Sequence, residues 1–276
     1  MEAICSSSLF RVAAPVYDQE SIRRAASEFS DISKNNILTG CVGCVDGWLC
    51  TIKAPSSREV PDVSAFFSGH YLQHGINVQA MCDAACRFTG YCFNPPGKVA
   101  DSVALKKWKL SLGIANLPLG YYVIGDNAYL LSSRVLAPFT KPEIKSTDYS
   151  DYNFYLSQLR IQTEMAFGLL VNKWQIFKRP LSVDFVHAGL VIKTCINLKL
   201  HNYCINERIR QPDSGGLTNA AVREFNSMED CSFSPTVVED DEEVVVPVMN
   251  GHIFRNVVLN HIQSYNLSRP TVHRRR

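Results

Sequence analysis

The stretch ILTGCVGCVDGWLCTIKAP occupies residues 37–55 and decides the fold class. Apolar and small residues dominate it, as is typical of buried β-structure. Gly47 and Trp48 lie between two apolar runs. The pattern therefore predicts a hairpin, with one strand ending at Asp46 and the next over about residues 49–53.

Three further short runs extend this sheet. HGINVQAMCDA at 74–84 and RFTGYCFNP at 87–95 are rich in β-forming residues and are separated by a predicted turn. YYVIGD at 121–126 is a brief apolar run that ends in Gly-Asp, which is typical of a buried strand in a parallel pair. Consecutive strands, followed by a strand after a helix, indicate an α/β domain with a mixed sheet, antiparallel at one side and parallel at the other.

Helices are predicted between and after these strands. Asp101 or Ser102 is expected to cap a helix that runs to about residue 112. The strongest helical pattern covers residues 151–174, where apolar residues recur at three- and four-residue spacing along one face. A further helix is expected over about residues 184–204.

The pattern divides the chain into three segments. Residues 1–36, with one short helix at about 19–29, are too short for a domain and are expected to be a helical remnant. Residues 37–206 hold the α/β domain. Residues 207–276 are mostly polar and lack periodicity, so a flexible tail is expected, acidic first and then basic. VVVPVMN and HIFRNVVLNHI are expected to be transient elements within it.

The composition of the 276 residues excludes several classes of protein. Hydrophobic residues make up 46% and charged residues 20%, which are the values of a globular chain, and no apolar run is long enough for a membrane span. The N-terminus lacks the pattern of a secretory signal, so the ten cysteines are expected to be reduced intracellular thiols. Up to residue 210 the chain carries 22 Lys and Arg against 17 Asp and Glu, a mildly basic balance that permits contact with nucleic acid.

Three acidic residues occupy places where a buried charge is costly. Asp46 and Asp126 end apolar runs, and Glu164 lies beside the apolar face of the long helix. Adjacent strand ends and a facing helix can bring such residues together, and the resulting hard oxygen ligands would suit Mg²⁺ or Mn²⁺. The alternative is that both aspartates only form turns, and that Glu164 pairs with Arg160 one helical turn back.

Five blocks of the sequence resemble, in the same order, the DDE-type transposases of the Harbinger (PIF) group. These blocks are GCVDGWLCTIKAP, HGINVQAMCDAACRFTGYCFNPPGKVADSVAL, VIGDNAYLL, RIQTEMAFGLLVNKWQIFKRPL and LKLHNYCI. The resemblance covers about residues 37–206. It implies a ribonuclease H-like fold, in which a mixed sheet is flanked by helices.

The resemblance also implies a function and a site. Asp46, Asp126 and Glu164 would be the catalytic and metal-binding triad, and Asp101 an additional acid at the metals. Two Mg²⁺ or Mn²⁺ ions would support hydrolysis of a DNA phosphodiester and attack of the freed 3′-hydroxyl on target DNA. Such a nuclease would act on DNA in the nucleus, together with a Myb-like DNA-binding protein.

Two departures from the family pattern favour a rival hypothesis. Trp48 follows Asp-Gly where the family usually has a small hydroxyl residue. About 36 residues precede the first motif, where the family has a helical, helix-turn-helix-like segment. On this hypothesis the chain is a catalytically silent, domesticated or decayed remnant that binds DNA or protein.

Basic residues near the acids are candidates for contacts with the DNA backbone, because they can neutralise phosphates. They are Lys106, Lys107, Lys173, Lys178 and Arg179. A solvated helix face is the alternative explanation for these residues.

The cysteines suggest a third hypothesis, a zinc-binding interaction module. Cys41, Cys44, Cys82 and Cys86 have the close spacing of some zinc ligands. Positions three apart in a strand point to opposite faces, however, so ordinary buried thiols are the simpler explanation.

Overall fold

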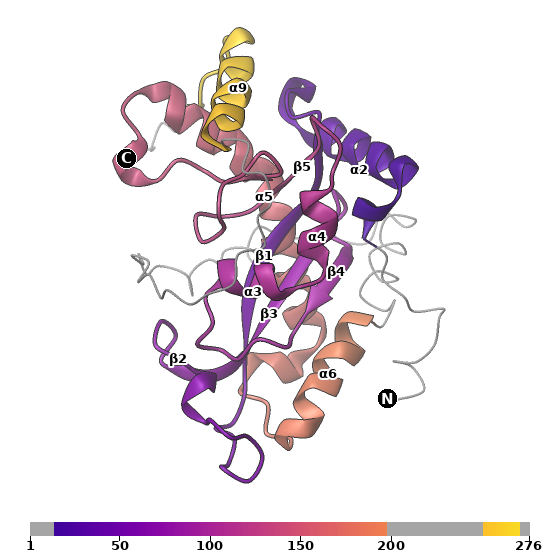
Figure 1. The fold of residues 1–276 in the computed structure, drawn as a ribbon, viewed down its shortest axis with the longest axis vertical. Helices are drawn as coiled ribbons and strands as arrows, with labels where there is room; N and C mark the ends of the chain where they lie inside the picture. Colours follow the sequence, from indigo (N-terminus) through magenta and orange to yellow (C-terminus); the bar gives the residue numbers. More distant parts are fainter. Residues whose placement is uncertain (1–13, 198–250, 271–276) are drawn as a thin grey trace, which may run out of the picture.

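The centre of the computed structural model, which describes residues 14–197 and 251–270, is a six-stranded mixed sheet (Figure 1). Its strands are β1 (Cys41–Thr51), β2 (Phe67–Ser68), β3 (Gln73–Cys82), β4 (Phe88–Cys92), β5 (Tyr122–Ile124) and β6 (Val135–Leu136). The order is β2-β3-β1-β5-β6, and β4 pairs with β3. β1 is antiparallel to β3 and parallel to β5, which confirms the predicted change from antiparallel to parallel pairing.

Strand β1 runs without interruption through the position of the predicted hairpin. Gly47 pairs with Gln79 and Trp48 pairs with Val78, so the prediction of a turn at these residues is wrong. The long strand β3 offers a partner to every residue of β1 from Cys44 to Thr51, and an extended backbone there satisfies its hydrogen bonds. Asp46 therefore lies in the middle of a strand.

Helices cover both faces of the sheet. They are α2 (Gln19–Ile32), α3 (Asp101–Lys107), α4 (Leu110–Ala115), α5 (Thr147–Lys173), α6 (Phe185–Asn197) and α9 (Gly251–Ser264). Buried residues of α5, α6 and α9 share one hydrophobic core with the sheet, and most of those of α2, α3 and α4 share a second. We call the two sides of the sheet the α5 face and the α3 face. Within the described ranges, no helix is both long enough and apolar enough to cross a membrane.

Helix α5 confirms the helix predicted over 151–174, although it begins earlier, at Thr147. Its predicted apolar face is buried, with Leu159 and Phe167 almost inaccessible to solvent. The Sγ of Cys44 in β1 donates to the carbonyl oxygen of Leu159, at 3.1 Å. The helix therefore lies directly over the strand that carries Asp46.

The helix predicted from residue 101 to about 112 is instead two short helices, α3 and α4, separated at Trp108. This residue has an extended backbone (φ −83°, ψ 129°), and its indole lies so close to Gly90 of β4 that a Cβ there would be 3.1 Å away. Packing of the indole on the sheet thus accounts for the break. Ala100 is the N-cap residue, so the predicted side-chain cap is also wrong. Helix α6 confirms the next predicted helix up to Asn197, and the rest of that range lies outside the described residues.

Helix α9 contradicts the prediction of a transient element in HIFRNVVLNHI. Its residues Val258, Leu259 and Ile262 belong to the core on the α5 face. Phe254 packs on Tyr122 of β5, with ring centroids 5.5 Å apart. Arg255 lies among these residues on the buried side of the helix, where an unpaired charge would be costly. The rest of the predicted tail, at 207–250 and 271–276, lies outside the described residues.

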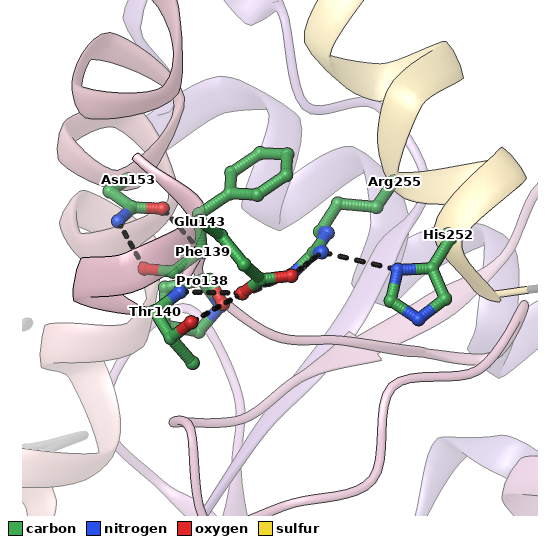
Figure 2. A network of polar contacts seen from close by, with 7 residues as sticks. All are labelled: Pro138, Phe139, Thr140, Glu143, Asn153, His252 and Arg255. Atoms are coloured by element: carbon green, nitrogen blue, oxygen red, sulfur yellow. Dashed lines mark hydrogen bonds and ion pairs between the residues drawn. The ribbon is translucent and has the colours of Figure 1, made fainter. Parts of the chain in front are cut away.

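Arg255 provides the polar contact that holds α9 against the domain (Figure 2). It is 4% exposed. Its guanidinium pairs with Glu143, donates to the carbonyl oxygen of Pro138 at 3.3 Å, and lies 3.9 Å from the ring centroid of Phe139. Two hydrogen bonds, of 2.7 and 2.8 Å, join the backbone of Phe139 to the side chain of Asn153 in α5.

Arg255→Met is expected to destabilise the fold and to reduce its sensitivity to acid. Burial raises the pKa of Glu143, but hydrogen bonds from Arg255 and Thr140 outweigh it and lower the pKa to about 2. A carboxylate with a lowered pKa stabilises the fold above its ordinary value of 4.5, and the contribution is lost as the pH falls toward 2. In urea denaturation we expect the free energy of unfolding to fall by about 1–3 kcal/mol at pH 7. As the pH falls from 5 to 3, the free energy of unfolding of Arg255→Met should decrease by less than that of the wild type.

Arg23→Met is the matched control for this substitution, because Arg23 is exposed on α2. It should change the free energy of unfolding by no more than about 0.5 kcal/mol. An acid sensitivity equal in the wild type and in Arg255→Met would contradict the assigned role of the ion pair.

Candidate active site

The three acidic residues predicted to act together come from three elements on the α5 face of the sheet. Asp46 lies in β1 and points to the same face as Cys44, two residues before it. Cys44 pairs with Ile124 in the parallel register, so Asp126, two residues after Ile124, follows β5 beside Asp46. Glu164 lies on α5, which covers this face. We call Asp46, Asp126 and Glu164 the acidic cluster.

The charges of these residues act on one another. Burial raises the pKa of Asp46 well above its usual range, and the Asp126 carboxylate raises it further. The Arg160 guanidinium opposes both effects, and Asp101 and Glu164 add to the upward shift. All four acidic residues that the sequence singled out are therefore electrostatic neighbours in the folded protein.

Asp126 has the turn-forming role that the alternative interpretation gave it. Its Oδ1 accepts a hydrogen bond from the backbone N–H of Ala128 at 2.8 Å, and its carbonyl oxygen accepts one from Tyr129 at 3.3 Å. Burial raises the pKa of Asp126, while the Ala128 hydrogen bond and the Arg160 charge oppose that shift. Asp46 differs, because it lies within a strand and its Oδ1 accepts from the next backbone N–H, that of Gly47, at 2.8 Å.

Glu164 is held by Arg160, as the alternative interpretation predicted. Arg160 Nη1 lies 2.5 Å from Glu164 Oε1, and the Glu164 side chain is only 7% exposed. The same guanidinium lowers the pKa of both aspartates of the acidic cluster against the effect of burial. Arg160 therefore supplies the positive charge that lets three acidic residues share a partly buried site. Its spacing four residues from Glu164 was the only signal of this role in the sequence.

Asp101 approaches the sheet from the α3 face. A Cβ on Gly47 would lie 2.3 Å from Asp101 Oδ1, so Asp101 lies on the side opposite to that of Asp46. Its Oδ1 accepts hydrogen bonds from Asn77 Nδ2 at 2.9 Å and from Gln79 Nε2 at 2.7 Å. Burial raises the pKa of Asp101, and these two hydrogen bonds oppose the shift. The role of Asp101 as a metal ligand stays a prediction.

The acidic cluster suits a divalent cation in its chemistry. It offers hard carboxylate oxygens whose mutual repulsion a cation would relieve. Among residues 14–197 and 251–270, however, no three His, Cys, Asp or Glu side chains lie together closely enough to hold a metal ion. In the described structure Glu164 is paired with Arg160 instead.

The same result leaves the zinc hypothesis without support in the described part of the chain. The thiol of Cys44 donates to a helix carbonyl, as noted above, and that of Cys82 lies 3.1 Å from Thr163 Oγ1. Burial raises the pKa of Cys86 to about 12. These cysteines are buried, protonated thiols that pack the core beneath α5.

Trp48 has a packing role beside the acidic cluster. It points to the α5 face, where its ring centroid lies 5.7 Å from that of Phe167 and 5.2 Å from that of Phe177. The aromatic contact fills the space between β1 and the end of α5. A large residue directly after Asp-Gly is therefore compatible with an intact site.

The five basic residues predicted to contact DNA are all exposed. Two lie in the last turn of α3, and three lie at the end of α5 or just after it. Exposure leaves their charges available to phosphates, and contact with DNA stays a prediction. They are Lys106, Lys107, Lys173, Lys178 and Arg179.

Comparison with known protein families gives a match, and it covers the region that holds the acidic cluster. A family model described as DDE superfamily endonuclease matches residues 45–202, which is more than half of the chain. The matched span contains the whole acidic cluster and Asp101. No curated protein and no solved structure matches the chain.

Proposed function

Because the chain belongs to the DDE superfamily endonucleases, we propose that it is a metal-dependent DNA endonuclease of the Harbinger-like transposase type. The observation that carries the proposal is the convergence of Asp46, Asp126 and Glu164, from three separate elements, on one face of the sheet. Carboxylates gathered in this way are costly to the fold, and a bound cation would offset that cost.

The acidic cluster would hold two divalent ions, Mg²⁺ or Mn²⁺, which when bound supply an activated water and stabilise the charge on the leaving oxygen of a phosphodiester. The chain itself positions these ligands. The sheet register fixes Asp46 beside Asp126, and the Ala128 hydrogen bond orients the Asp126 carboxylate. Arg160 orients Glu164 and would compete with a bound cation for it.

The substrate and partner also belong to this proposal. Exposed Lys106 and Lys107 follow Asp101 on α3, and exposed Lys173 ends α5, the helix that carries Glu164. Contacts from these lysines to phosphates would make binding weaker as salt concentration rises. We further propose that the protein acts in the nucleus, with a separate Myb-like protein that supplies sequence recognition.

Asp126→Asn is expected to abolish nicking of supercoiled plasmid in Mg²⁺ or Mn²⁺. Asparagine keeps the oxygen that accepts from Ala128, so the loop is retained while the negative charge is lost. The control is Asp31→Asn, which alters an exposed aspartate on α2 and should nick at the wild-type rate. Nicking that survives Asp126→Asn would reveal a contaminating nuclease or the wrong carboxylates.

Two observations on the structure favour the silent-remnant hypothesis. Glu164 is already paired with Arg160, and the described residues contain no ready set of three metal ligands. If the wild-type protein does not nick plasmid, the same assay should be repeated with a Myb-like partner and a substrate that carries terminal repeats. Absence of cleavage there as well would overturn the endonuclease proposal in favour of a binding module.

A further inference from the structure

Each aspartate of the acidic cluster has a glycine as its neighbour in the chain. Gly47 follows Asp46, and Gly125 precedes Asp126. Side chains alternate along a strand, so the two glycines face the α3 side while both aspartates face α5. On the α3 face, atoms of other residues occupy the space that side chains at these two positions would fill.

Polar side chains from three elements occupy that space. They are Asn77 and Gln79 of β3, Asp101 of α3, and Tyr129 of the segment between β5 and β6, and we call them the back-face network. A Cβ on Gly47 would lie 2.3 Å from Asp101 Oδ1 and 2.6 Å from Gln79 Nε2. A Cβ on Gly125 would lie 2.6 Å from the Tyr129 ring. The network is thus in contact with the backbone beside both aspartates.

Gln79 is the residue that joins this network into one unit. It is fully buried. Its Nε2 donates to Asp101 Oδ1 at 2.7 Å and to Asn77 Oδ1 at 2.8 Å, and its Oε1 accepts from the hydroxyl of Tyr129 at 2.7 Å. Both amide hydrogens and the carbonyl oxygen of one side chain therefore have partners, on three different residues.

Asn77 completes the connection to α3. Its Nδ2 donates to Asp101 Oδ1 at 2.9 Å and to the carbonyl oxygen of Val99 at 2.9 Å, just before the helix begins. Asp101 is thereby fixed by two amides on β3, the strand that also pairs with β1 at Asp46. The hydroxyl of Tyr129 links the same amides to the segment that carries Asp126.

We propose that Gln79 is a positioning residue for the acidic cluster: it fixes the segment of Asp126 relative to β1 and α3 through hydrogen bonds on the face opposite to the carboxylates. This inference rests on the proposed function, because metal binding by the acidic cluster is the purpose that the network would serve. It also assigns Asp101 a place in a hydrogen-bonded support behind the cluster. Loss of outer hydrogen-bond partners typically weakens metal binding by about 10–100-fold.

The test compares Gln79→Met and Tyr129→Phe with Asn153→Leu. Methionine matches glutamine in size and removes its three hydrogen bonds, and phenylalanine removes only the hydroxyl while its ring still covers Gly125. Asn153→Leu removes two partly buried hydrogen bonds to Phe139, away from the network, and so controls for a general loss of stability. The measurements are amide hydrogen exchange over residues 125–134, Mn²⁺ binding by loss of the free-ion paramagnetic resonance signal, and plasmid nicking.

Both network variants should show faster exchange over 125–134, and Mn²⁺ affinity and nicking rate each lower by about 10–100-fold. Asn153→Leu should leave the exchange rate, the Mn²⁺ affinity and the nicking rate unchanged. Each protein is measured at the same number of degrees below its own melting temperature. Unchanged exchange in Gln79→Met and Tyr129→Phe would overturn the positioning role, whatever the metal does. Faster exchange together with a wild-type protein that neither binds Mn²⁺ nor nicks DNA would instead overturn the proposed function, and with it the assigned purpose of the network.

Discussion

Asp46→Asn should lower the rate of metal-dependent plasmid nicking by at least about 1000-fold, which corresponds to about 4 kcal/mol. Asp46 is the carboxylate on which the charges of all the other site residues act. Asparagine keeps the Oδ1 that accepts from the N–H of Gly47, so the strand is retained. The loss would therefore report on the charge, and it is measured as the initial rate of open-circle formation under saturating Mn²⁺.

The same substitution should stabilise the protein in the absence of metal. Burial raises the pKa of Asp46, so the ionised form is unfavourable in the fold, and stability is lost as the pH rises from the ordinary value of 3.8 through the raised value. A neutral asparagine avoids that loss. We expect the free energy of unfolding to rise by about 1–3 kcal/mol at pH 7 with a chelator present, in urea denaturation.

The two results together separate a functional carboxylate from a structural one. A structural aspartate would lower stability when it is replaced, and its loss of activity would follow its loss of fold. Asp31→Asn, on the exposed end of α2, should leave both quantities unchanged. Asp46→Asn that is less stable than the wild type, or that still nicks DNA, would contradict the assignment of Asp46.

Gly47→Ala should reduce nicking by about 100-fold or more, although it changes no charged or polar group. The added Cβ would lie 2.3 Å from Asp101 Oδ1 and 2.6 Å from Gln79 Nε2, well inside van der Waals contact. Gln79 Nε2 donates a hydrogen bond to Asp101 Oδ1, so the two atoms cannot both move away from the new Cβ without loss of the network. Displacement of β1 or of α3 would then shift Asp46 relative to the rest of the acidic cluster.

Gly69→Ala is the matched control for Gly47→Ala. Gly69 is exposed between β2 and β3, and a Cβ at this position would meet nothing within 4 Å. It should nick DNA at the wild-type rate, while Gly47→Ala should also lose about 1–3 kcal/mol of unfolding free energy because of the overpacking. Equal rates in the two variants would show that the back-face network tolerates a side chain at position 47.

Elements with a clear hydrophobic period were predictable from the sequence. The apolar face of α5, the two β-rich runs that form β3 and β4, and the short apolar run of β5 all lie where the pattern indicated. The continuity of β1 through Gly47, in place of the predicted hairpin, was not predictable in this way. Gly-Trp after an aspartate is typical of a turn in isolation, and only the long partner strand β3 keeps β1 extended through it.

The predictions for α9 and for the helix that is split into α3 and α4 failed for the same kind of reason. Arg255 is a poor core residue by itself, and its burial becomes favourable only because Glu143 and Phe139, more than a hundred residues earlier in the chain, surround its guanidinium. Trp108 stops α3 because its indole packs on β4. Both outcomes depend on contacts between segments that are distant in sequence.

The sequence by itself singled out the residues that we propose carry the chemistry, because acidic groups beside apolar runs are costly and thus conspicuous. Only the tertiary structure decided how they are arranged. The pleat of β1 and β5 places Asp46 and Asp126 on the face under α5 and their glycine neighbours on the other face, where Asp101 belongs to the back-face network. Whether a side chain reaches a given neighbour depends on strand register and helix packing, which are set by the burial of the whole core and leave no local mark in the sequence.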